Sequence, residues 1–167
     1  MKYLAAILLG VLAASSATAN AQHNRGAELH WVKAGNGPID PRAVSVGTMA
    51  DGLPVYVCYA PYRGGNHPGL TAMFTEGCVI GFAGKTVDIK GHSILIGRGR
   101  WVPASGGHVP PNAVEGGNEA NDNILYVCRA RHQGSMYAGK VREGFRGCNF
   151  GDLGKEMTAA NYEVLVR

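Results

Sequence analysis

The chain has 167 residues, of which 16 are Lys or Arg and 12 are Asp or Glu, giving a net charge of +4. The basic residues are interspersed, and the clusters Arg98-Gly99-Arg100 and Arg129-Ala130-Arg131 lack interleaved aromatics, so we expect solvated faces and no nucleic-acid partner. No segment is apolar over the roughly 20 residues that a membrane-spanning helix needs, so we expect no membrane insertion.

Residues 1–21 are typical of a cleaved signal peptide. Met1 and Lys2 precede an apolar run over residues 3–14, and small residues follow with an A-x-A step from Ala19 to Ala21. We predict a secreted, extracellular protein, cleaved after Ala21 or Ala19. Residues 22–167 would then form one domain, and loss of Lys2 leaves 15 basic and 12 acidic residues, a net charge of +3.

Residues 31–97 and 101–167 are two copies of one repeat, aligned by a shift of 70 positions without a gap. Together the copies occupy most of residues 22–167, which predicts one compact domain whose halves pack face to face about a pseudo-twofold axis. The matching positions include Trp31/Trp101, Pro41/Pro111, Tyr56/Tyr126, Gly69/Gly139, Gly81/Gly151 and Leu95/Leu165.

Short β-rich runs stand between the glycines in both copies. They are β-branched or aromatic and mostly bounded by Gly, Pro or Asn, and no segment repeats apolar residues at helical spacing over a dozen positions. The predicted fold class is therefore all-β, with two tandem antiparallel β repeats related by a pseudo-twofold axis. The runs are residues 55–59, 78–80, 93–96, 125–128 and 162–166.

The four cysteines are predicted to form two disulfides, because the chain is expected to enter an oxidising compartment. No pair has the close C-x-x-C spacing of a zinc site. All three pairings of the four are compatible with twofold symmetry, so only closeness in sequence favours Cys58 with Cys78 and Cys128 with Cys148.

Motifs of nucleotide-binding, metal-binding or catalytic sites are missing from the sequence. A phosphate-binding loop ending at Gly84-Lys85 would need Gly where Val79 stands, so Gly84-Lys85 and Gly154-Lys155 are predicted to be turns. No G-x-S-x-G elbow is present. We expect no enzyme, cofactor or metal. The histidines have no paired ligand spacing and are predicted to lie on the surface; they are His23, His30, His67, His92, His108 and His132.

The second copy contains P-x-A-V-x-G-G at Pro111 to Gly117, Y-V-C-R-A at Tyr126 to Ala130 and G-K-V at Gly139 to Val141. In this combination the chain resembles the DM9 repeat (DUF3421) family over residues 31–167. The resemblance implies an intertwined all-β unit of two repeats that can form a homodimer. It also implies a mannose-binding lectin of the invertebrate type.

The resemblance assigns the sugar contacts to an acidic residue two positions after the G-G step and to the lysine of the G-K step. In this chain these are Glu119, where the family has Asp, and Lys140. A carboxylate that accepts and an ammonium that donates can together hold adjacent sugar hydroxyls. The first copy has Met49 and Leu70 at these positions, so one site per chain is predicted.

The polar segment between Gly117 and Ile124 supplies further candidates, namely Asn118 and Asp122, with Asn121 between them. We therefore expect a secreted lectin-like protein that binds mannose-type glycans in glycan or microbe recognition. The alternative is a non-catalytic structural or interaction module of an extracellular coat or matrix, which the missing site residues of the first copy favour.

The signal-peptide prediction is tested by expressing the full chain in a secretory host. We expect the protein in the medium, with an N-terminus at Gln22 or Asn20 by Edman sequencing or mass spectrometry. Retention in the cell with Met1 still present would contradict it.

Overall fold

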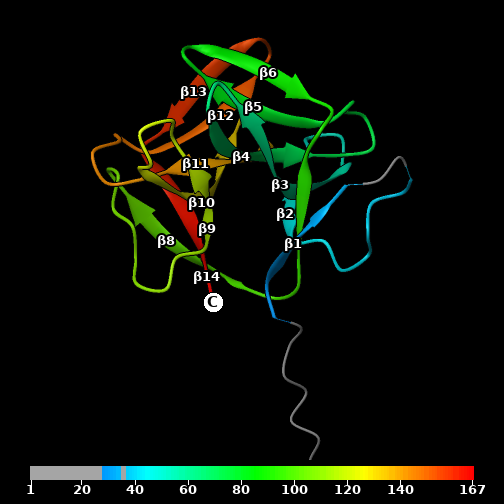
Figure 1. The fold of residues 1–167 in the computed structure, drawn as a ribbon, viewed down its shortest axis with the longest axis horizontal. Helices are drawn as coiled ribbons and strands as arrows, with labels where there is room; N and C mark the ends of the chain where they lie inside the picture. The colour runs from blue at the N-terminus through cyan, green and yellow to red at the C-terminus, as the bar shows by residue number, and fades with distance from the viewer. Residues whose placement is uncertain (1–27, 35–36) are drawn as a thin grey trace, which may run out of the picture.

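The computed structural model describes residues 28–34 and 37–167, so the predicted signal peptide lies outside the described part. The described chain is antiparallel β throughout, which confirms the predicted fold class (Figure 1). No helix long and apolar enough to cross a membrane is found in those two ranges.

Each copy of the repeat contributes seven strands at equivalent positions. The first copy forms β1 (His30–Lys33), β2 (Ser45–Thr48), β3 (Pro54–Tyr62), β4 (Gly65–Thr71), β5 (Cys78–Phe82), β6 (Lys85–Ile89) and β7 (Ser93–Ile96). The second forms β8 (Arg100–Ser105), β9 (Glu115–Asn118), β10 (Ile124–His132), β11 (Ser135–Val141), β12 (Cys148–Asp152), β13 (Lys155–Ala159) and β14 (Asn161–Val166).

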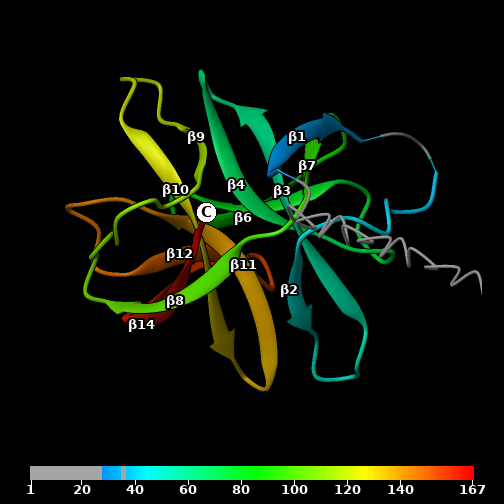
Figure 2. The same cartoon turned by 90° about the horizontal axis from the view of Figure 1, so that it is seen from below.

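All fourteen strands belong to one sheet whose order mirrors itself about its middle. The path runs β1-β7-β3-β4-β5-β6 and then β13-β12-β11-β10-β14-β8. The two halves meet where β6 pairs with β13 at Lys85 and Lys155, which are equivalent residues of the two copies. Figures 1 and 2 show the copies on opposite sides of this junction. The pseudo-twofold axis therefore passes between β6 and β13, so the copies join edge to edge as well as by face contacts.

Tight hairpin turns set the register of the paired strands. Arg63-Gly64 and Gln133-Gly134 both have two left-handed residues, with φ of 49° and 82° in one and 47° and 81° in the other. Two left-handed residues in succession are the type I′ geometry that matches strand twist, and glycine adopts it at little steric cost. The Ala83-Gly84 and Leu153-Gly154 turns have the same form, so the glycine of each Gly-Lys pair lies in a turn and the lysine begins the next strand.

The backbones of β5 and β12 approach closely near the axis. A Cβ added at Gly81 would lie 2.7 Å from the carbonyl oxygen of Phe150, and one added at Gly151 would lie 2.7 Å from that of Ile80. A real side chain at either position must push the opposing backbone away. The two glycines thus permit the contact that holds the copies together.

Strands β2 and β9 add contacts between the copies. β9 pairs with β10 of its own copy and also with β4 of the other, through Asn66 and Asn118. On the opposite side, the Arg129 guanidinium donates to the carbonyl of Val46 on β2 at 3.0 Å and to Glu163 at 2.7 Å, and it stacks on Trp101. The prediction of a solvated face is therefore wrong for Arg129.

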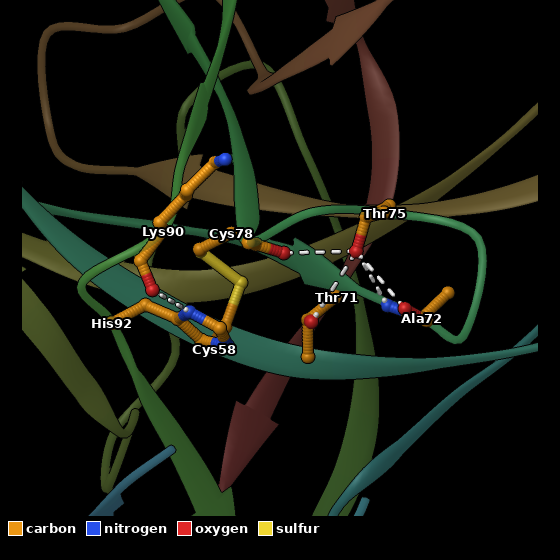
Figure 3. Close-up of a disulfide and its surroundings, with 8 residues drawn as sticks. Cys58, Thr71, Ala72, Thr75, Cys78, Lys90 and His92 are labelled. Atoms are coloured by element: carbon orange, nitrogen blue, oxygen red, sulfur yellow. Dashed lines mark hydrogen bonds between the residues drawn. A yellow bond between two sulfur atoms is a disulfide. The ribbon is translucent and has the colours of Figure 1, made fainter. Parts of the chain in front are cut away.

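The disulfides Cys58–Cys78 and Cys128–Cys148 confirm the pairing favoured by closeness in sequence. Each links the first long strand of its copy to the strand after the β4–β5 or β11–β12 loop. Figure 3 shows the first bridge and the loop beside it. In this loop the Thr75 hydroxyl accepts a hydrogen bond from the Ala72 amide at 3.0 Å and donates one to the Gly77 carbonyl at 2.9 Å. Both bridges lie within a copy, so none links the halves.

The close approach near the axis predicts that Gly81→Ala and Gly151→Ala destabilise the protein. Each added methyl meets backbone of the other copy, and overpacking of this kind costs about 1 to 3 kcal/mol. Gly91→Ala is the control, because its Cβ meets nothing within 4 Å and its φ is not left-handed. In urea denaturation, the midpoint urea concentrations of Gly81→Ala and Gly151→Ala should lie well below that of the control. Equal midpoints for the three variants would contradict the role of the two glycines at the axis.

Candidate functional site

An open cavity of about 360 Å³ lies where the β3–β4 hairpin of the first copy meets the β9–β10 turn of the second. Its walls come from both copies, since the hairpin and β5 contribute one side and the turn contributes the other. The lining residues are Arg63, His67, Phe82, Glu119, Ala120 and Asn121. Glu119, the predicted sugar acceptor, is therefore in a cavity.

Glu119 follows β9 and is held in place on both sides. Its backbone amide donates to the Asn123 carbonyl at 2.9 Å, which closes the turn. Its carboxylate accepts from the Arg142 Nε at 2.9 Å and from the Asn123 side-chain amide at 3.4 Å. A carboxylate has more acceptor positions than these two donors occupy, so Glu119 can still accept from a ligand hydroxyl.

Lys140 lies behind the cavity rather than on its surface. It is 5% exposed on β11, and its Nζ lies 3.4 Å from the His67 Nδ1, 3.8 Å from the Glu156 carboxylate and 5.2 Å from the Phe82 ring centre. Burial lowers the pKa of Lys140, while the charges of Glu156 and Glu119 oppose that shift. The structure therefore brings Lys140 and Glu119 to the same site, with His67 and Phe82 between the lysine and the open cavity.

His67 is 2% exposed, so its prediction as a surface histidine is wrong. Burial, and after it the charge of Lys140, lower the pKa of His67 to about 4. The ring is therefore neutral at pH 7. Its Nδ1 accepts from Lys140, which leaves the proton on Nε2 to donate to the Tyr62 carbonyl at 3.2 Å. The edge of this ring also contacts Phe82, with 5.0 Å between centroids.

The other predicted site residues surround the cavity in different roles. The Asn118 side chain accepts from Asn66 at 3.2 Å and donates to the Glu119 carbonyl at 2.9 Å, so it braces the turn against the first copy. Asn121 lines the cavity. Asp122 is exposed in the turn with φ of 66° and is not among the lining residues.

The equivalent place in the other half has different chemistry. Leu70, which replaces Lys140, is buried in the core, and Met49, which replaces Glu119, is half-buried and packs against the core. Tyr137 takes the position of His67, stacks on Phe150 and donates to the Asp152 carboxylate at 2.8 Å, and burial raises the pKa of Tyr137 to about 12. The twofold symmetry of the backbone thus does not extend to the site.

Arg63, His67 and Phe82 were not predicted as site residues. The repeat alignment holds one signal, since these positions differ from their counterparts Gln133, Tyr137 and Asp152 while the adjacent glycines match. No spacing rule places a hairpin of one copy against a turn of the other. In the described ranges no group of three or more His, Cys, Asp or Glu side chains is arranged to hold a metal ion.

The low pKa of His67 predicts a loss of stability at acidic pH. The unfolded chain protonates this histidine near its ordinary pKa of 6.5, whereas the folded protein does so only near 4, so stability falls as the pH is lowered between these values. The full difference corresponds to roughly 3 kcal/mol.

Denaturant unfolding at a series of pH values should show a shallower pH dependence for His67→Gln than for the parent. His108→Gln, at an exposed position, controls for the loss of a histidine as such. If the unfolding free energies of the parent and His67→Gln changed with pH in parallel, the buried histidine would not contribute to the pH dependence of stability.

A family model described as "DM9 repeat" matches the sequence twice, over residues 18–89 and 72–159. The matches overlap over residues 72–89, and their bounds differ from those of the copies at 31–97 and 101–167. No curated protein sequence matches the chain. The two family matches cover most of the sequence, agree with the paired β repeats described above, and show that this chain belongs to the DM9 repeat family.

Proposed function

We propose that this protein is a non-catalytic, lectin-like carbohydrate-binding protein that binds mannose-type glycans at the cavity between its copies. The observation that carries the proposal is the convergence of Glu119 and Lys140, which are 21 positions apart in the sequence, on one cavity with aromatic rings. Membership of the DM9 repeat family supports carbohydrate binding as the function.

The cavity offers both kinds of contact that a sugar uses. The Glu119 carboxylate is a charged acceptor for hydroxyl groups, and charge-assisted hydrogen bonds are stronger than neutral ones. Phe82, which is half-buried and packs on the buried His67 ring, presents ring surface to the apolar C–H groups of a sugar. A few oriented polar groups beside apolar walls are the usual composition of a small-molecule site.

Lys140 supports the site from behind in the structure described here. Its ammonium is within 4 Å of both His67 and Glu156, so it holds the ring and adds positive charge under the cavity. Its contact with His67 is long for a hydrogen bond. Because Lys140 is 5% exposed, a sugar hydroxyl reaches this ammonium only if His67 or Phe82 moves aside.

Secretion and a role in glycan or microbe recognition are part of the same proposal. Two disulfides are compatible with an extracellular protein, and the sequence begins with a predicted signal peptide. A single weak site per chain gives useful avidity only in an oligomer, so we also propose a homodimer that displays both cavities outward.

A structural or interaction module without sugar binding is the second candidate. It is favoured by the charges of the site already being partnered, Glu119 by Arg142 and Lys140 by Glu156. In that case these residues would only brace the contact between the copies. Direct binding measurements separate the two functions.

Titration of the ¹⁵N-labelled protein with methyl α-mannoside should shift amide signals around the cavity. We expect a dissociation constant on the order of millimolar to tens of micromolar, because few contacts form on an open site. Glu119→Gln removes the charged acceptor and should weaken binding about tenfold. Glu115→Gln, an exposed substitution on the adjacent strand, is the matched control.

Lys140→Met is the companion variant, since it keeps the length of the buried side chain and removes the charge. It should weaken binding while the spectrum retains the dispersion of a folded protein. If the parent binds no glycan, or if Glu119→Gln and Lys140→Met bind as the parent does, the lectin proposal fails and the structural module remains.

A further inference from the structure

Arg63 is a positively charged residue at the cavity, and the proposed function assigns no role to its charge. It lies at the tip of the β3–β4 hairpin, is exposed and lines the cavity. None of the ion pairs within the described ranges includes it. Its guanidinium lies 5.7 Å from the centre of the Tyr62 ring.

The tip of the β3–β4 hairpin packs closely against the β9–β10 turn, which forms the other wall of the cavity. A Cβ added at Gly65 would lie 2.4 Å from the Asn118 carbonyl oxygen, and one added at Gly64 would lie 3.4 Å from the Cβ of Ala120. The tip therefore rests on the residues that flank Glu119. This contact fixes the backbone of Arg63 beside the acceptor of the site.

Among the residues that the structure describes, the charges around the cavity leave one positive charge without a partner. Glu119 is paired with Arg142 at 2.9 Å, and Lys140 is paired with Glu156 at 3.8 Å. His67 is neutral at pH 7 because its pKa is about 4. Arg63 supplies the remaining charge, at the mouth of the cavity where a ligand enters.

A guanidinium is suited to planar or tetrahedral anions, because its N–H groups bind two oxygens of a carboxylate, sulfate or phosphate at once. We propose that the cavity prefers a hexose that carries an anionic substituent over the neutral sugar, with Arg63 binding the substituent. This inference rests on the proposed function, since Glu119 still holds the ring hydroxyls.

The second copy provides a natural replacement for Arg63. Gln133 occupies the equivalent position in the β10–β11 hairpin with φ of 47°, against 49° for Arg63. Arg63→Gln therefore places in this turn a residue that the same turn already accommodates. The variant should fold as the parent does and lose only the charge.

The experiment measures binding of four related sugars by isothermal titration calorimetry at low salt. Methyl α-mannoside is the neutral probe, and mannose 6-phosphate, mannose 6-sulfate and mannuronic acid carry charge at C6, leaving the other ring hydroxyls for Glu119. We expect at least one charged sugar to bind the parent about fivefold more tightly than the neutral one. This preference should diminish in about 0.5 M salt, which screens an exposed charge.

Arg63→Gln should lower the affinity for the charged sugars to that for methyl α-mannoside and so remove the preference. Arg131→Gln, which makes the same charge change at an exposed position on β10, should retain the preference. The three charged probes also distinguish a carboxylate from a sulfate or phosphate as the group bound.

Each contrary result has a definite meaning. If the neutral sugar binds as tightly as all three charged ones, this inference is overturned and the proposed function stands. It is also overturned if Arg63→Gln keeps the preference, or if Arg131→Gln loses it equally, because net charge would then explain the effect. If no sugar binds the parent, both proposals fail.

Discussion

The contact between β5 and β12 across the pseudo-twofold axis is the constraint on which the rest of the structure depends. Gly81 and Gly151 let the two backbones approach to a distance that no side chain permits. This approach allows β6 to pair with β13 and lets the sheet continue from one copy into the other. The cavity also lies between the copies, where the β3–β4 hairpin of one meets the β9–β10 turn of the other.

The electrostatics of the cavity follow from its position at this junction. Lys140 and His67 come from different copies, and their contact buries an ammonium that burial alone would disfavour. The charge is tolerated because Glu156 lies nearby and His67 remains neutral. Glu119 and Arg142 are likewise already paired at this cavity in the folded protein, at 2.9 Å.

The sequence was sufficient to predict the repeat, the β class, the disulfides and the turns, because each depends on local residue type or on a register that both copies share. Matching pairs such as Trp31/Trp101 set that register. The sequence alone could not predict that His67 is buried or that Lys140 lies behind the cavity, since both depend on contacts between strands distant in the sequence. Arg129 was misplaced for the same reason, because Val46 of the other copy is among its partners.

The shared cavity restricts how the two halves of a duplicated chain can diverge. Leu70 shows that the first copy lacks the lysine of the G-K step, yet the hairpin of that copy still forms a wall of the site through Arg63 and His67. The first copy, which has Met49 and Leu70 where the second has Glu119 and Lys140, thus supplies one wall of the cavity that holds Glu119. A substitution in either half can change the same cavity.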